Sequence, residues 1–120
     1  MLCINEDLES ALKQYIVLLE DKKYFDAHEA LEAAWHPLRL SKDPLANLLK
    51  GLINGAVALE HIKRGGENYA GRAQRVIVSY ERHKSLCTEG IEHYRLFSAA
   101  CQKMERLKNE HPDVFQSPLV

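Results

Sequence analysis

The stretch around which the chain is organised, residues 24–35, reads Tyr24-Phe25-Asp26-Ala27-His28-Glu29-Ala30-Leu31-Glu32-Ala33-Ala34-Trp35. At about 100° per residue its apolar side chains gather in one arc, which predicts an amphipathic helix. His28 and Glu32 fall inside that arc, one helical turn apart, where apolar residues are expected. We therefore expect both side chains to be at least partly buried, with Glu29 at the border of the arc. A carboxylate in an apolar setting needs a partner, so this pair marks a candidate site.

The length and composition of the chain fit a single soluble domain. Its 120 residues are 46% hydrophobic and 28% charged, with a formal net charge of -1. A chain of this length can bury about two-thirds of the surface that it exposes when unfolded, which leaves room for one core. It contains no run of about 18 apolar residues and no signal segment, so we expect a cytoplasmic protein without membrane contact.

Three cysteines, Cys3, Cys87 and Cys101, are spread along the chain. An odd number at wide spacing fits neither a disulfide framework nor a zinc knuckle. We expect them to be reduced thiols that serve in packing.

Apolar residues recur at helical spacing along most of the chain, and no stretch shows the alternation typical of a β-strand. Asn5 and Asp43 are expected to cap helices, and Pro37 is expected to kink or end the helix that begins at residue 24. The expected helices cover residues 5–20, 24–36, 44–64, 69–86 and 88–111. The sequence therefore predicts an all-α fold, a single-domain bundle of about five helices over residues 1–112, followed by a loose tail over residues 113–120.

The expected helix over residues 44–64 is the most apolar, and we place it at the centre of the bundle. Gly51 and Gly55 lower helix stability unless another backbone comes close, so they predict a tight helix crossing. Beside these glycines lies a polar stripe, which we expect to face the helix over residues 24–36 and which consists of Lys50, Asn54 and His61.

Three stretches together resemble a known family. They are residues 24–35, residues 65–71 and residues 50–61, the last of which read Lys50-Gly51-Leu52-Ile53-Asn54-Gly55-Ala56-Val57-Ala58-Leu59-Glu60-His61. Their pattern is aromatic-x-x-His-Glu-x-x-Glu-x-x-Trp, then Gly-Leu-Ile-x-x-Ala-x-x-x-x-His, then a glycine-asparagine turn. It is similar to the pattern of the bacterial and archaeal family called domain of unknown function 309. The likeness extends over residues 8–86, although Asn54 replaces a common glutamine and Glu67 separates Gly66 from Asn68. The resemblance implies an all-helical fold without an established activity.

The candidate pocket lies between residues 24–35 and residues 50–61. It comprises His28, Glu29, Glu32, Trp35, Asn54 and His61. One hypothesis is a hydrolytic pocket that binds a small molecule or a metal, with His28 and Glu32 as a coupled proton-carrying pair. The alternative is a non-enzymatic structural or protein-interaction module, in which the same residues form a buried hydrogen-bond network. The reaction and the small-molecule ligand stay open.

A divalent metal is another partner that could neutralise the charge of Glu32. In the zinc motif His-Glu-x-x-His, the two histidines are ligands and the glutamate is the general base. By that analogy His28 and Glu32 would be ligands, Glu29 the base, and His61 a third ligand from the other helix. Nitrogen and oxygen ligands of this kind suit zinc, iron or manganese. A dinuclear site is not expected, because the repeated Glu-x-x-His motif that it needs is absent.

The charge pattern gives no sign of a nucleic-acid partner. Several basic residues fall between residues 72 and 84, but Glu81 and apolar positions interrupt them, which favours a solvated helix face. These basic residues are Arg72, Arg75, Arg82, His83 and Lys84. A homodimer would form if part of the wide apolar surface over residues 44–64 were left uncovered.

Overall fold

The computed structural model of the protein describes residues 4–115. These residues form α1 (Ile4–Glu20), α2 (Tyr24–Leu40), α3 (Leu45–Arg64), α4 (Tyr69–His83), the 3-10 helix η1 (Lys84–Leu86), α5 (Tyr94–Asn109) and α6 (Pro112–Phe115). No strand occurs among residues 4–115, so the predicted all-α bundle with five principal helices is confirmed.

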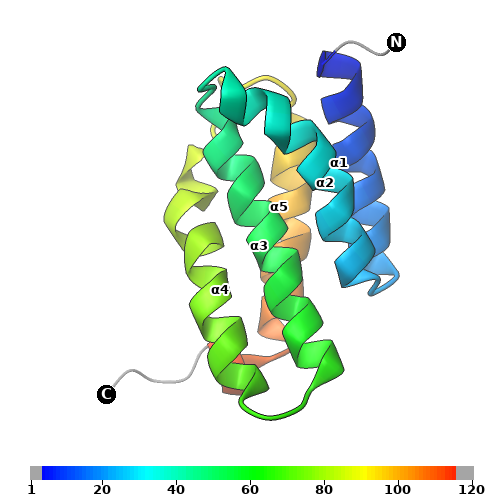
Figure 1. The fold of residues 1–120 in the computed structure, drawn as a ribbon. Coiled ribbons are helices and arrows are strands. Elements are labelled where there is room, and N and C mark those ends of the chain that lie inside the picture. The colour runs from blue at the N-terminus through cyan, green and yellow to red at the C-terminus, as the bar shows by residue number, and fades with distance from the viewer. Residues whose placement is uncertain (1–3, 116–120) are drawn as a thin grey trace.

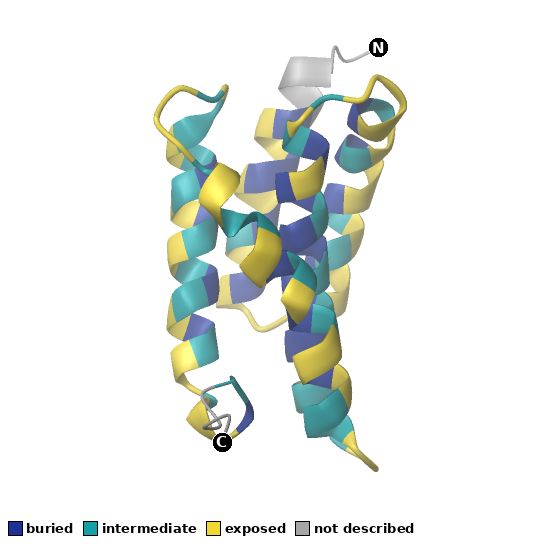
Figure 2. Ribbon diagram, turned by 90° about the vertical axis from the view of Figure 1, so that its left-hand side faces the viewer, coloured by how far each residue is buried: buried dark blue, intermediate teal, exposed yellow. Residues whose placement is uncertain are grey.

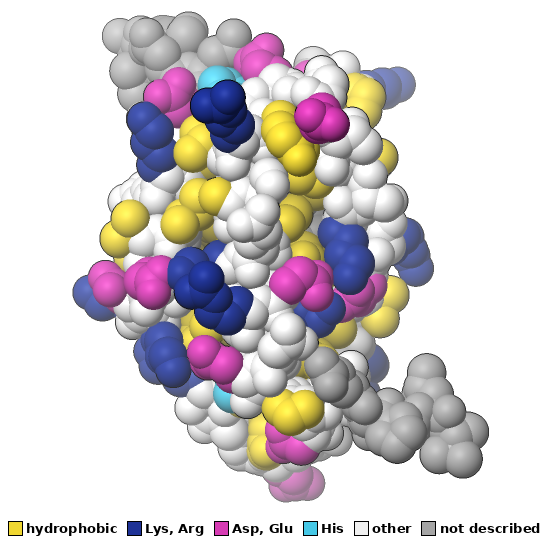
Figure 3. Space-filling view, turned by 180° about the vertical axis from the view of Figure 1, so that it is seen from behind, with side chains coloured by type: hydrophobic (Ala, Val, Ile, Leu, Met, Phe, Trp, Pro, Cys, Tyr) yellow, Lys and Arg dark blue, Asp and Glu magenta, His cyan; other side chains and the backbone are white. Residues whose placement is uncertain are grey.

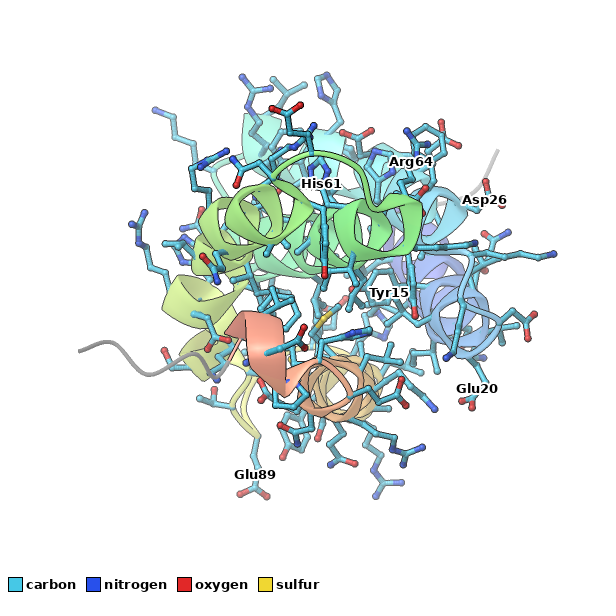
Figure 4. All side chains as sticks on the ribbon, turned by 90° about the horizontal axis from the view of Figure 1, so that it is seen from below. Tyr15, Glu20, Asp26, His61, Arg64 and Glu89 are labelled. Atoms are coloured by element: carbon cyan, nitrogen blue, oxygen red, sulfur yellow. The ribbon has the colours of Figure 1, made fainter. Side chains whose placement is uncertain are left out.

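Helices α2, α3 and α4 lie side by side in one layer, and α1 and α5 pack behind it (Figure 1). The view along the helices shows α3 in the middle of the layer (Figure 4). Helix α3 contacts α2, α4 and α5, as expected for the most apolar helix. One face of the layer is therefore left open to solvent along α2, α3 and α4.

The core lies between the layer and the two helices behind it (Figure 2). On α2 the buried side chains are Tyr24, Ala27, Leu31, Ala34 and Leu38. Their spacing of three and four residues is that of one helix face, which is why α2 packs on a single side. Tyr15 of α1 is fully buried, and its hydroxyl donates to the Leu52 carbonyl oxygen at 2.6 Å, which joins α1 to α3.

Three predicted helix boundaries are wrong, one of them the end of α4, which lies at His83 instead of residue 86 because η1 follows. Helix α2 continues past Pro37 to Leu40, because Leu38 packs in the core and offsets the hydrogen bond that proline removes. Helix α5 begins at Tyr94 instead of residue 88, after His93 in a left-handed conformation with φ of 60°. Asp43 does cap α3, since its Oδ1 accepts a hydrogen bond from the Leu45 amide at 2.9 Å.

The start of the predicted tail is also different from the expectation. Pro112–Phe115 form the short helix α6, in which Val114 is buried. The Val114 carbonyl oxygen accepts a hydrogen bond of 2.8 Å from the Gln74 amide of α4. Residues 113–115 therefore pack on the bundle, while residues 116–120 lie outside the described part of the chain. Within that part, no helix combines the length and the apolar character needed to cross a membrane.

The predicted tight crossing occurs where α4 passes α3 at Gly51. A Cβ atom at Gly51 would lie 3.1 Å from the Tyr80 Cα and 3.2 Å from the Ser79 carbonyl oxygen. Both of these neighbours are backbone atoms that cannot rotate away. A Cβ atom at Gly55 would instead meet the end of the Met104 side chain, 2.8 Å away on α5. Only glycine at residue 51 lets the two backbones approach this closely.

We predict that Gly51→Ala destabilises the protein by about 1–2 kcal/mol, because overpacking against a backbone outweighs the gain of about 1 kcal/mol in helix propensity. Gly55→Ala gains the same propensity but displaces only the flexible end of Met104, so its loss should be smaller. Urea unfolding of both variants measures the difference. Equal stability of the two variants would contradict a backbone contact at Gly51.

Candidate functional site

The imidazole of His28 is held in one orientation on the surface of α2. Its Nδ1 lies 2.6 Å from the Phe25 carbonyl oxygen, and its ring centroid lies 4.9 Å from that of Phe25. A carbonyl oxygen only accepts, so Nδ1 carries the hydrogen. The other nitrogen, Nε2, lies 3.5 Å from Glu32 Oε1. Nε2 is thus the ring nitrogen that faces the carboxylate.

The pair is more exposed than the sequence predicts. The His28 side chain is 16% exposed, but that of Glu32 is 48% exposed, so the expected burial of Glu32 is wrong. The apolar arc of α2 is narrower than predicted, and Phe25, which was expected to close it, is itself 46% exposed. Glu29 is exposed as well. None of the six candidate side chains is fully buried, so they form no buried hydrogen-bond network.

The two α3 candidates face the open side of the layer. Asn54 and His61 are half-buried there, and Figure 4 shows His61 on the outer side of α3, away from Tyr15 in the core. Nowhere in the described chain do three His, Cys, Asp or Glu side chains come together in a group that could hold a metal ion. His28, Glu32 and His61 therefore do not assemble the predicted metal site.

Trp35 is the candidate that lines a groove. A groove of about 400 Å³ is lined by Trp35, and none of the other five candidates lines it. The groove lies where α2 ends and α3 begins. Lys50 Nζ of α3 lies 4.4 Å from the Trp35 ring centroid, and Arg39 Cζ of α2 lies 5.3 Å from it. Two cations from different helices thus meet on one aromatic ring.

The remaining charges of this groove are Lys42 and Asp43 in the turn between the helices. Asp43 is occupied by its hydrogen bond to the Leu45 amide. Of the predicted stripe on α3, Lys50 reaches α2, because it contacts Trp35. Arg39 follows Trp35 by one helical turn, so its place beside the ring could have been found from the spacing. The participation of Lys42 depends on the turn and has no signal in the sequence.

A second polar cluster, which the sequence analysis missed, joins α4 to α5. The Tyr80 hydroxyl donates to Glu105 Oε2 at 2.6 Å, and Lys84 Nζ lies 3.2 Å from the same oxygen. These side chains line a groove of about 580 Å³ together with Cys87 and Cys101. Charges of both signs and apolar side chains are interspersed on the back of the molecule (Figure 3). This groove therefore has no single charge preference.

The chemistry of this second groove is that of a structural cluster. Burial raises the pKa of Cys101 to about 12, and it also raises the pKa of Cys87. Both described thiols are free and protonated at neutral pH, so neither is an activated nucleophile. Burial and the hydrogen bond to Glu105 raise the pKa of Tyr80, which keeps its hydroxyl a donor. Cys3 lies outside the described residues.

Comparison with known proteins gives one family. The family described as Domain of unknown function (DUF309) matches residues 12–73, slightly more than half of the chain. The matched segment includes α2, α3 and the groove between them. Comparisons with curated proteins and with solved structures give no significant match.

We predict that Glu32→Gln lowers the free energy of unfolding by no more than about 0.5 kcal/mol, because an exposed ion pair contributes little. Urea unfolding at neutral pH measures this, with Glu29→Gln as a matched control that removes an exposed charge from the same helix. A loss above about 1 kcal/mol for Glu32→Gln alone would instead make the pair a structural clamp.

We predict that Tyr80→Phe lowers stability at neutral pH by about 1 kcal/mol, because Glu105 loses a donor. Partial burial acts to raise the pKa of Glu105, but the Tyr80 hydrogen bond and the charges of Lys108 and Lys84 outweigh it and hold the pKa below its usual 4.5. A carboxylate with a lowered folded-state pKa stabilises the fold above its unfolded pKa, and this contribution disappears as the pH falls through the folded pKa.

The difference between Tyr80→Phe and the wild type should therefore shrink as the solution is acidified below pH 4.5. Thermal unfolding over an acid series tests this. Tyr94→Phe is the control, since Tyr94 lines the same groove. A Tyr80→Phe difference that is constant with pH would show that the hydrogen bond to Glu105 is not its cause.

Proposed function

The chain belongs to the DUF309 family, and we propose that it is a ligand-binding helical module whose site is the groove beside Trp35. The ligand that we propose is a small anion with a phosphate or carboxylate group. The proposal rests on one observation. The cationic groups of Lys50 and Arg39 both lie over the Trp35 ring, and neither cation has a carboxylate partner in the described part of the chain.

The charge balance of the groove supports an anionic ligand. Among residues 8–115, no ion pair joins Arg39, Lys42 or Lys50 to a carboxylate. Asp43 is the acidic residue in the lining, and its Oδ1 accepts from the backbone. Three cations therefore face one engaged carboxylate. Guanidinium and ammonium groups in such a setting bind phosphate or carboxylate oxygens through charge-assisted hydrogen bonds.

The size of the groove fits a small molecule. Its volume of about 400 Å³ lies within the range of about 300–1,000 Å³ that is typical of small-molecule sites. His28 precedes Trp35 by seven residues, or about 10 Å along the helix axis. A small anion beside Trp35 would therefore not reach the His28 and Glu32 pair. The hydrolytic form of the hypothesis has less support than binding alone.

The alternative of a protein-interaction module is favoured by one observation. The His28 and Glu32 pair lies on an open helix face beside the exposed Phe25 ring. The homodimer has less support, because the exposed large apolar residues are scattered. They are Val17, Phe25, Leu40, Val78 and Leu86.

We predict that inorganic pyrophosphate raises the melting temperature of the wild type and that Arg39→Met with Lys50→Met abolishes this shift. At a concentration about 100-fold above Kd, a bound ligand adds about 2.7 kcal/mol to stability. Each variant is compared with its own ligand-free melting temperature, because removal of the two cations also removes their contacts with Trp35.

The control for this experiment is Lys23→Met with Arg95→Met, which removes two exposed cations outside the groove. It should keep the full shift. Calorimetric titration with pyrophosphate gives the affinity directly. Absence of binding to the wild type, or equal loss of binding in the control, would contradict the proposed site.

A further inference from the structure

The acidic and basic side chains of α4 lie on different sides of the helix, which their order in the sequence does not show. In sequence order Glu81 interrupts the basic residues, but in space it faces α5. Its carboxylate contacts Lys108 and lies 2.7 Å from Lys84 Nζ. His83 instead faces α3, since a Cβ atom at Gly51 would lie 3.6 Å from its Cβ. Glu81 therefore does not neutralise the side of α4 on which His83 lies.

Three arginines of α4 remain on its outer side. Arg72, Arg75 and Arg82 are exposed. Positions 72, 75, 79 and 83 share one face of a helix, so Arg72 and Arg75 lie on the same side as His83. Arg82 precedes His83 and lies seven residues, or two turns, after Arg75. Arg72 donates to the Glu67 carbonyl oxygen. Within residues 8–115, Arg75 and Arg82 form no ion pair.

Helix α3 continues this positive surface. Lys50, Asn54 and His61 form its outer stripe, and α3 lies beside α4 in the layer (Figure 1). The carboxylate of α3 is Glu60, which is held by Arg64 at 2.5 Å. The acidic residues of α3 and α4 are therefore both engaged in ion pairs. We use the name basic face for the following six residues of α3 and α4: Lys50, His61, Arg72, Arg75, Arg82 and His83.

We propose that the basic face binds a single strand of nucleic acid. Arg72 and Arg82 are ten residues apart, which is about 15 Å along α4. Neighbouring phosphates of an extended single strand lie about 6 Å apart, so the three arginines span about three phosphates, and Lys50 of α3 is the fourth cation of the face. A small anion would touch one or two of the arginines, whereas a strand would engage all of them. Arginine is also the side chain best suited to bidentate contacts with phosphate.

The shape of the face favours a single strand over a duplex. Helices α3 and α4 pack side by side at Gly51, so neither projects from the surface. A major groove admits a helix that projects from its domain, and a flat pair of helices does not meet this requirement. A flexible strand can instead lie along the seam between the two helices, where the half-buried Ser79 lies close to Gly51.

This proposal goes beyond the small-anion site and does not depend on it. The groove beside Trp35 uses Arg39 and Lys42, whereas the strand needs Arg75 and Arg82. The two sites share Lys50. The two proposals can therefore fail separately.

The test is fluorescence anisotropy of labelled oligouridine and oligothymidine strands with the full chain, over a series of salt concentrations. The logarithm of the association constant should fall with the logarithm of salt concentration, with a slope of about -3 for about four phosphate contacts. Arg75→Gln with Arg82→Gln should weaken binding about tenfold or more and reduce the magnitude of the slope by about 1.4, because two contacts are lost. Arg95→Gln with Arg106→Gln, on α5, removes the same charge and should leave binding unchanged.

Circular dichroism and thermal unfolding establish that each variant is folded before its binding is measured. The Arg75 and Arg82 variant should still bind pyrophosphate, which separates this site from the groove beside Trp35. Failure of the wild type to bind either strand at low salt would overturn the proposal. So would equal weakening by the α5 control, tighter binding of duplex DNA than of single strands, or binding of inorganic polyphosphate alone.

Discussion

The backbone contact between α3 and α4 at Gly51 sets the arrangement of the other helices. Because residue 51 has no side chain, the Tyr80 Cα and the Ser79 carbonyl oxygen can pack directly against α3. Helix α3 can then hold α4 on one side and α2 on the other while α5 packs behind it. A central helix with neighbours on three sides keeps only a narrow outer stripe in contact with solvent.

That stripe explains why function is proposed on the open face of the layer. Lys50 extends from α3 across to Trp35 of α2, and its place there depends on how closely the two helices pack. The cations that gather on this face have few carboxylate partners, because Glu60 and Glu81 are already held in ion pairs. Unpaired cations on a surface attract anions, whether small or polymeric. The proposed anion groove and the proposed strand-binding face thus both depend on this one packing arrangement.

The His28 and Glu32 pair is less suited to function than the groove beside Trp35. Its imidazole is oriented by the Phe25 carbonyl oxygen, yet the carboxylate beside it is half in solvent. An exposed pair of this kind contributes little to stability and lacks the enclosure that strengthens acid-base chemistry. The pair lies on the same helix as Trp35, which lines the proposed ligand groove. The groove that we propose as the ligand site lies two turns further along α2, at Trp35.

The amino-acid sequence by itself determined the features that depend on neighbours along one helix. The spacing of Tyr24, Ala27 and Leu31 predicts the buried face of α2, and Gly51 predicts a close crossing, because both depend on helical periodicity and side-chain size. Only the tertiary structure decided that Lys50 meets Trp35 and that Glu81 turns toward Lys108. These contacts join residues from different helices, and their distances depend on how the helices pack, which no local pattern specifies.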